Sequence, residues 1–106
     1  FHKYNIYYFI DRFDSEEIKN LDKKINIIFR NYKQSDLDYT IRDLSFFCKK
    51  YNQKLFISNN SYLARKYSLN GLYIPSFNKL DNFKNISFKK NFKIIGSAHN
   101  EQEIII

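Results

Sequence analysis

Short apolar runs recur along the chain and alternate with segments of helical periodicity. The runs are Tyr7–Ile10, Ile25–Phe29, Leu55–Ile57, Leu72–Ile74 and Phe92–Ile95. Such short, nearly continuous apolar runs are typical of parallel strands that are covered on both faces. The alternation therefore predicts an α/β fold built from repeated β/α units, with parallel neighbouring strands in chain order and helices outside the sheet.

The clearest helix is predicted after the second run. One apolar stripe is formed there at spacings of three and four residues by Leu37, Ile41, Leu44, Cys48 and Tyr51. Ser35 precedes this stripe and is expected to cap the helix.

Two shorter helices are predicted near Ser15 and over residues 60–67. Asn70 and Gly71 supply the stop for the second of these, because both residue types tolerate positive φ. One or two further helical turns are expected between residues 77 and 91.

The two ends of the chain suggest a portion of a larger domain. The first residue is Phe1, and the last three are isoleucines that follow an acidic stretch, Glu101 and Glu103, which resembles the opening of a helix. No Pro/Gly/Ser-rich linker divides the sequence. We therefore expect residues 1–106 to form a single partial domain.

Composition supports a folded protein. Of the 106 residues, 43% are apolar and 19% are aromatic, which is enough to build a core and excludes a disordered chain. No apolar run reaches about 18 residues, so a soluble, cytoplasmic protein with no membrane partner is predicted. The single cysteine, Cys48, excludes an intrachain disulfide framework and is expected to be a buried apolar residue.

The net charge of +7 raises nucleic acid as a partner. However, the chain has 14 lysines and no valine, a pattern that AT-rich codon usage produces without any anionic ligand. The aromatic residues also follow strand and helix periods rather than interleaving with basic residues on one exposed face. A basic nucleic-acid-binding domain is therefore a remote alternative.

Polar residues follow every apolar run. These residues are Asp11-Arg12, Arg30-Asn31-Tyr32, Ser58-Asn59-Asn60, then Ser76 and Asn78, and finally Ser97 and His99. The carboxyl ends of parallel strands share one edge, where ligands bind in β/α sheets and barrels. We therefore predict that Arg30, Asn59, Asn78, Ser97 and His99 lie on the same edge.

The order of these motifs resembles the thiamine-phosphate synthase family, which includes the thiazole tautomerases. The matching segments are Tyr7-Tyr8-Phe9-Ile10-Asp11, Ile27-Ile28-Phe29-Arg30-Asn31-Tyr32, Leu55-Phe56-Ile57-Ser58-Asn59, Ala64, Gly71-Leu72-Tyr73-Ile74-Pro75 and Ile94-Ile95-Gly96-Ser97-Ala98-His99. The resemblance implies a TIM-type barrel of eight β/α units, of which this chain covers about five. A fragment of that size is expected to be inactive by itself.

The resemblance implies a transferase of thiamine biosynthesis. It couples a hydroxymethylpyrimidine diphosphate to a thiazole phosphate and releases pyrophosphate. Arg30 is expected to face the diphosphate, with Lys33 as a second cation, while Asn59 and Ser97 bind phosphate or diphosphate groups. The simpler roles are an ion pair with Asp11 for Arg30 and a helix cap for Ser97.

The family's magnesium ion has doubtful ligands in this chain. Asn59 and Asn78 occupy positions where the family has carboxylates, and a neutral amide is a poorer magnesium ligand. We therefore expect weak binding of free magnesium, with tighter binding only as a magnesium-diphosphate complex held by Arg30.

His99 defines the alternative activity. In a thiazole tautomerase it would be the acid/base, a role that suits an imidazole, whereas its simpler role is to fix the loop by hydrogen bonding. A ligand-binding relative of the same barrel without catalysis is a further alternative.

Overall fold

The computed structural model describes residues 5–75, 90–96 and 103–105. Ser76, Asn78, Ser97 and His99 lie outside the described residues, as do nearly all of the helical turns expected between 77 and 91.

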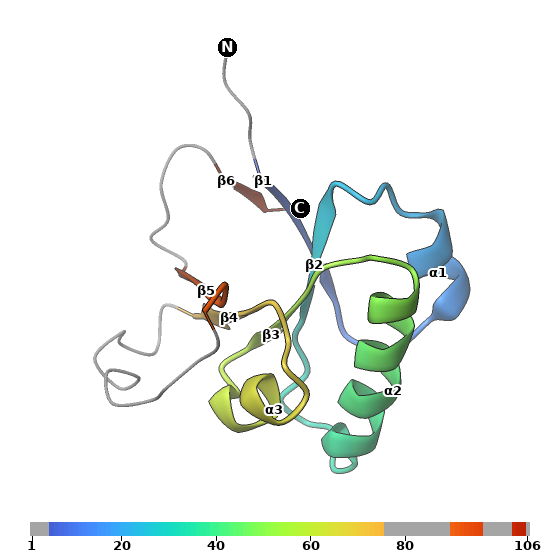
Figure 1. Cartoon of the computed structure of the whole chain (residues 1–106). Helices are drawn as coiled ribbons and strands as arrows, with labels where there is room; N and C mark the ends of the chain where they lie inside the picture. Colours follow the sequence, from blue (N-terminus) through green and yellow to red (C-terminus); the bar gives the residue numbers. More distant parts are fainter. Residues whose placement is uncertain (1–4, 76–89, 97–102, 106) are drawn as a thin grey trace.

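The described residues form one parallel sheet with helices between its first four strands. The elements in chain order are β1 (Asn5–Ile10), α1 (Ser15–Asn20), β2 (Ile25–Phe29), α2 (Leu37–Lys50), β3 (Leu55–Ser58), α3 (Ser61–Lys66), β4 (Gly71–Ile74), β5 (Lys93–Gly96) and β6 (Glu103–Ile105). The strand order is β5-β4-β3-β2-β1-β6, and all neighbours are parallel. The predicted order of the first five strands is confirmed (Figure 1).

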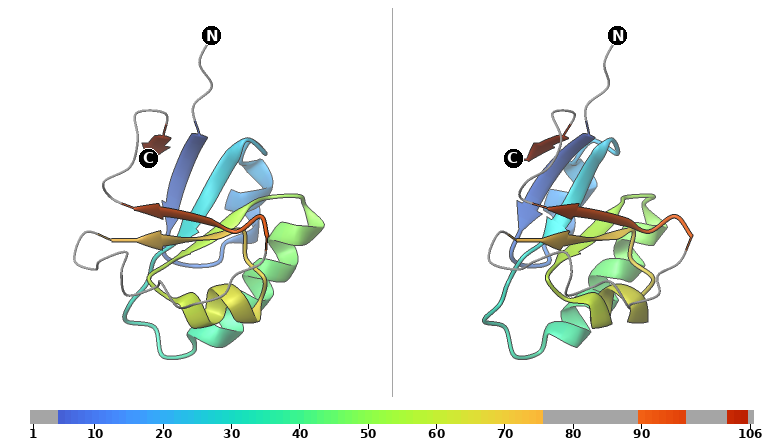
Figure 2. Two further views of the ribbon diagram at one scale, coloured as in Figure 1. Left: turned by 60° about the vertical axis from the view of Figure 1, so that its left-hand side comes forward. Right: turned by 90° about the vertical axis from the view of Figure 1, so that its left-hand side faces the viewer.

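The sheet is curled into a half-barrel. The rings of Tyr7 on β1 and Phe56 on β3 have centroids 5.4 Å apart, and those of Phe9 on β1 and Tyr73 on β4 are 5.3 Å apart. In a flat sheet β1 would lie about 10 Å from β3 and about 14 Å from β4. Curvature therefore brings these side chains together on the concave face, and Figure 2 shows the strand direction turning from β1 to β5.

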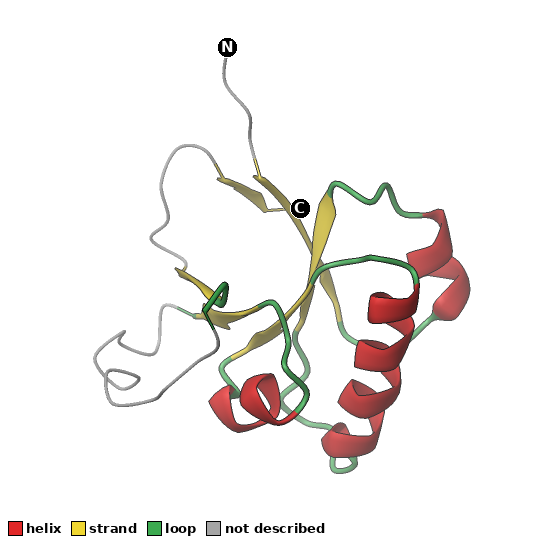
Figure 3. Cartoon of the chain, in the orientation of Figure 1, coloured by secondary structure: helices red, strands yellow, loops and turns green. Residues whose placement is uncertain are grey.

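Side chains on the two faces of the sheet form separate apolar clusters. The helices pack on one face, as Figure 3 shows, and cover the residues Ile10, Ile27, Phe29, Leu55, Ile57, Leu72 and Ile74. The concave face carries Tyr7, Ile28, Phe56, Tyr73 and Ile95, with Phe9 packed against them. This period of two explains why the strand sequences are apolar on both faces.

The expected burial of Cys48 is confirmed, since it is 1% exposed on the inner side of α2. Desolvation raises the pKa of its thiol to about 12. Among the described residues, no helix has the length and apolarity needed to cross a membrane.

The start of α2 differs from the prediction that Ser35 caps it. The N-cap position is held by Asp36, which makes no side-chain cap bond. Its carboxylate instead accepts a hydrogen bond from Nε2 of Gln34 at 2.9 Å. In contrast, Asp14 caps α1 through the amides of Glu16 and Glu17.

The prediction that Asn70 and Gly71 end α3 through positive φ is also wrong, because a different residue has that backbone conformation. The left-handed residue is Ser68, with φ of 49°. Asn70 instead accepts a hydrogen bond from the amide of Leu55 at 2.9 Å, and Gly71 is the first residue of β4. A strand residue is needed there because β4 pairs with β3 and β5 from Gly71 onward.

The acidic stretch near the end of the chain does not open a helix at Glu103. Glu103–Ile105 form β6, whose backbone pairs with Asn5–Tyr7 of β1. Isoleucine is β-branched and favours extended backbone, and β1 supplies the hydrogen-bonding edge.

Candidate functional site

The loops after β1, β2 and β3 meet at the C-terminal edge of the sheet. Arg30 directly follows β2, and its amide donates to the carbonyl of Ile10 at 2.8 Å. Asn59 directly follows β3, and its amide donates to the carbonyl of Tyr73 at 2.8 Å. These backbone bonds fix both predicted residues beside the ends of neighbouring strands. Lys33 lies in the exposed loop after Arg30.

The side chain of Arg30 stacks on an aromatic ring. Its guanidinium carbon lies 4.0 Å from the centroid of Phe9, on the neighbouring strand β1. Within the described residues, the ion pairs of the structure do not include the Asp11 pair considered above. The charge of Arg30 therefore meets the quadrupole of an aromatic face instead of a carboxylate.

A cavity of about 250 Å³ lies beside Arg30. Phe9, Asp11, Arg12 and Arg30 contribute to its lining, and Glu17 of α1 closes one side. Glu17 accepts a hydrogen bond from the hydroxyl of Tyr8 at 2.8 Å, which raises the pKa of that tyrosine. Nothing in the sequence pattern marks this contact between β1 and α1.

A second cavity, of about 170 Å³, lies between the loops after β2 and β3. Its polar wall is entirely neutral and consists of Asn31, Tyr32, Ser58, Asn59 and Asn60. The hydroxyls of Tyr32 and Ser58 hydrogen-bond across it. Asn59 has a left-handed φ of 57°, a conformation that asparagine tolerates better than most residues. Hydrogen-bonding ligand groups without charge fit this wall best.

The described residues do not fit a magnesium site held by the protein. No group of three His, Cys, Asp or Glu side chains that could hold a metal ion occurs in the part of the chain that the structure describes. At the edge next to β3, Asn59 offers only a neutral amide. We therefore derive no chemical step through a metal.

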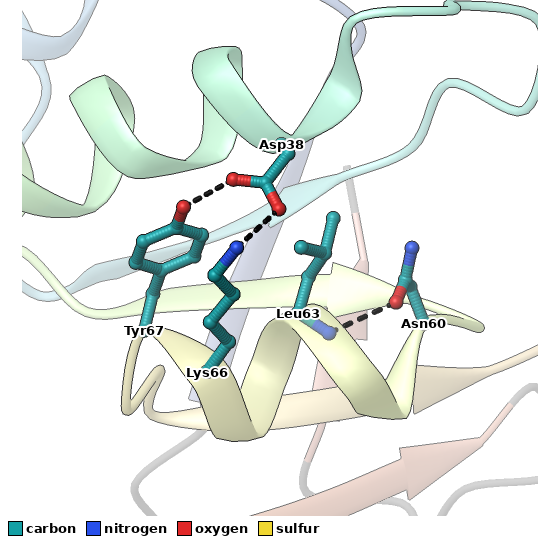
Figure 4. Close-up of polar contacts among 5 residues, drawn as sticks. All are labelled: Asp38, Asn60, Leu63, Lys66 and Tyr67. Atoms are coloured by element: carbon teal, nitrogen blue, oxygen red, sulfur yellow. Dashed lines mark hydrogen bonds and ion pairs between the residues drawn. The ribbon is translucent and has the colours of Figure 1, made fainter.

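A polar network between α2 and α3 positions the loop that carries Asn59 (Figure 4). Asp38 of α2 accepts hydrogen bonds from Nζ of Lys66 at 2.7 Å and from the hydroxyl of Tyr67. Asn60 caps α3 through the amide of Leu63 at 3.0 Å. The lysine bond raises the pKa of Lys66 and lowers that of Asp38.

These contacts join residues 28 and 29 positions apart, so no local pattern predicts them. Within its own helix, Asp38 is simply an acidic residue of the first turn, where it complements the helix dipole. Its contact with α3 follows from the packing of consecutive β/α units.

Comparison with known proteins adds no family and no function to this description. No protein-family model matches the chain, and searches of curated proteins and of solved structures also gave no match.

Proposed function

We propose that β1 to β5 are five strands of an eight-stranded TIM-type barrel with the activity of a thiamine-phosphate synthase, in which the last strand of the complete barrel takes the place of β6 beside β1. The single observation that carries the proposal is the placement of Arg30. Its guanidinium lies at the C-terminal edge, over the ring of Phe9, and lines a cavity of about 250 Å³. This edge is the ligand-binding edge of parallel β/α folds.

Stacking leaves Arg30 suited to bind a diphosphate. The guanidinium carbon lies over the ring of Phe9, and within the described residues the guanidinium makes no ion pair with a carboxylate. Guanidinium N–H donors match the spacing of phosphate oxygens and can bind two of them at once. An arginine held by an aromatic ring therefore keeps its charge and its donors for a ligand.

The concave face holds Phe9, the ring beneath Arg30, in an aromatic cluster. Tyr7, Phe9, Phe56 and Tyr73 present their rings on this face in edge-to-face pairs. Tyr7, Phe56 and Tyr73 are buried, so a pyrimidine or thiazole ring would contact this cluster at the half-buried Phe9. The neutral side chains that line the second cavity, Asn59 among them, lie in the adjacent loops and suit uncharged ring substituents.

In the proposed reaction, the bond between the pyrimidine methylene carbon and a diphosphate oxygen breaks. Pyrophosphate leaves with the electron pair, and the thiazole nitrogen forms a new bond to the methylene carbon. Negative charge grows on the departing oxygens, so a fixed guanidinium stabilises the transition state more than the ground state. This role is assigned to Arg30, with Lys33 as a second cation in the adjoining loop.

The test measures thiamine phosphate formation by the complete barrel protein, with hydroxymethylpyrimidine diphosphate and thiazole phosphate as substrates. Product and pyrophosphate should form in equal amounts. Arg30→Ala should lower kcat/KM by roughly 30- to 1,000-fold, equivalent to about 2–4 kcal/mol. Arg42→Ala is the matched control because this exposed arginine lies on α2, beside the ring of Tyr39 and away from the edge.

Two results would overturn the proposal. The first is no thiamine phosphate from a folded complete protein. The second is an equal loss of activity in Arg30→Ala and Arg42→Ala, which would mean that Arg30 has no specific role.

A further inference from the structure

Lysine side chains gather at the N-terminal edge of the sheet, opposite the proposed site. Five of them lie in α1, in the loop that leads into β2, at the end of α2 and directly before β3. They are Lys19, Lys23, Lys24, Lys50 and Lys54, and all five are exposed. We name this group the basic edge. In Figure 1 the segments that lead from α1 to β2 and from α2 to β3 both cross the upper part of the molecule.

Three of these lysines converge on one aromatic ring. The ammonium nitrogens of Lys19, Lys23 and Lys50 lie 6.0, 5.5 and 5.6 Å from the centroid of Tyr51. Any two of them are therefore less than about 12 Å apart, which is within about one and a half screening lengths at physiological salt. Three like charges at this spacing repel one another, and an anion placed among them would relieve that repulsion.

Nearby carboxylates offset little of this charge. Glu16 lies 4.0 Å from Lys19, in an exposed pair of the kind that contributes little. Asp22 is the one acidic residue in the described segments that lead into β2, β3 and β4, and it accepts from the amide of Lys24. AT-rich codon usage explains a high number of lysines, but not their grouping around the ring of Tyr51.

We propose that the basic edge binds the phosphate backbone of single-stranded nucleic acid without sequence preference. Lysine is a flexible point charge that suits successive phosphates, whereas base recognition favours arginine. The lysines come from two successive connections, from α1 to β2 and from α2 to β3, and thus form an extended surface that fits a polymer better than one small anion. The half-buried ring of Tyr51, which packs against Phe47, holds three of these ammonium groups near one another.

An anionic membrane is the less favoured partner. The rings of Phe47 and Tyr51 pack together with centroids 4.6 Å apart, and both residues are half-buried. Phe46, 74% exposed, lies one helical turn before Lys50 and offers only a single side chain for insertion into lipid.

The test measures the fluorescence anisotropy of a labelled oligouridine of about 20 nucleotides, titrated with the chain at several salt concentrations. The variant K23Q/K50Q removes two charges of the basic edge. R42Q/R65Q is the matched control, because it removes two exposed charges elsewhere on α2 and α3. Circular dichroism and thermal unfolding establish that each variant is folded.

We expect K23Q/K50Q to weaken binding by on the order of tenfold or more in about 50 mM NaCl. The slope of log K against log salt should shrink by about 1.4, which is about 0.7 for each lost phosphate contact on a single strand. R42Q/R65Q should change binding by less than about threefold, as expected for charges outside the contact. If K23Q/K50Q does not fold, K24Q/K54Q gives the same test.

Three outcomes would overturn the proposal. One is the absence of salt-dependent binding by the wild-type chain, and another is an equal loss in both double variants. The third is binding to vesicles of about one part phosphatidylserine to three parts phosphatidylcholine, but not to oligouridine, which would identify the basic edge as a membrane-binding surface.

Discussion

The guanidinium carbon of Arg30 lies 4.0 Å from the centroid of the Phe9 ring, and Phe9 in turn meets Tyr73 edge to face at 5.3 Å. This stack connects side chains from β1, β4 and the end of β2. It depends on the curvature of the sheet, because β1 and β4 are not neighbours in the strand order. Arg30 is thus positioned by an aromatic ring that is itself fixed in the concave core.

The first prediction concerns the ring of Phe9. Phe9→Leu keeps an apolar side chain but removes the cation–π contact, which is worth about 0.5–1 kcal/mol at an exposed site. Pyrophosphate affinity of the complete protein, measured by calorimetry, should fall by about two- to fivefold. Phe13→Leu is the control, since Phe13 packs against Phe47 on the helical side. An unchanged affinity in Phe9→Leu would contradict a positioning role.

The strand order was predictable because each strand is a short apolar run followed by polar residues. The stack of Arg30 on Phe9 was not, although both residues were part of the recognised motifs. The sequence places them 21 positions apart, and only the parallel pairing of Ile10 with Phe29 and the curl of the sheet bring them together. An ion pair between Arg30 and Asp11 was an equally reasonable expectation from sequence.

Two incorrect predictions, for the start of α2 and the end of α3, have the same cause. Ser35 is a good capping residue and Asn70-Gly71 a good helix stop, but both assignments rest on local propensity alone. Specific side-chain hydrogen bonds decide the outcome. One is local, between Gln34 and Asp36, and the other joins Asn70 to the amide of Leu55 on the neighbouring strand. The three expected edge residues Asn78, Ser97 and His99 lie outside the described residues, so their placement stays a prediction.

Gly71 is predicted to be intolerant of a side chain. A Cβ atom at this position would overlap the backbone oxygen of Lys93 and the ring of Phe56. Because the obstacle is partly backbone, Gly71→Ala should lower the free energy of unfolding by about 1–3 kcal/mol in urea denaturation. Ser35→Ala should stay within about 0.5 kcal/mol, because Ser35 is exposed and does not cap α2. Equal stability of the two variants would contradict the close approach of β4 and β5.

The contact between α2 and α3 predicts acid sensitivity. The bonds from Lys66 and Tyr67 lower the pKa of Asp38 in the folded state. A group with a depressed folded-state pKa stabilises the protein above its unfolded-state pKa, and that contribution is lost as pH falls through the folded-state value. The free energy of unfolding should therefore decrease below about pH 4.

Urea denaturation between about pH 2 and pH 7 tests this prediction. In Asp38→Asn the free energy of unfolding should fall less steeply below about pH 4, because the variant has no carboxylate at position 38 to protonate. Asp43→Asn, which removes the exposed partner of Arg42, serves as the control. An acid limb of unchanged steepness in Asp38→Asn would show that other carboxylates account for the acid sensitivity.

Magnesium binding should be weak in the absence of diphosphate. Asn59 presents an amide where a carboxylate would bind the ion more strongly, so the complete protein should bind free Mg²⁺ with a dissociation constant no tighter than about 1 mM. Asn59→Asp should tighten this binding, and asparagine and aspartate both tolerate the left-handed backbone at this position. Calorimetry that gives micromolar affinity for the wild-type protein would contradict the prediction.

The last prediction separates the synthase from the tautomerase by the residue that each activity requires. In a synthase, Arg30→Ala removes a charge-assisted bond to the departing diphosphate and costs roughly 30- to 1,000-fold in rate, whereas His99→Ala has a smaller effect. In a tautomerase, His99→Ala removes the acid/base and costs about a hundred- to ten-thousand-fold, and Arg30→Ala acts mainly on ligand affinity.

Both variants of the complete protein are therefore assayed for thiamine phosphate formation and for thiazole tautomerisation, with kcat and KM measured separately. We expect the larger loss of kcat in Arg30→Ala, because Arg30 lies over the Phe9 ring at the C-terminal edge and lines the cavity there. The reverse order would assign the protein to the tautomerase branch. Insensitivity of both activities to both substitutions would reject each enzyme and favour the ligand-binding relative, since neither residue would then act on a reacting group.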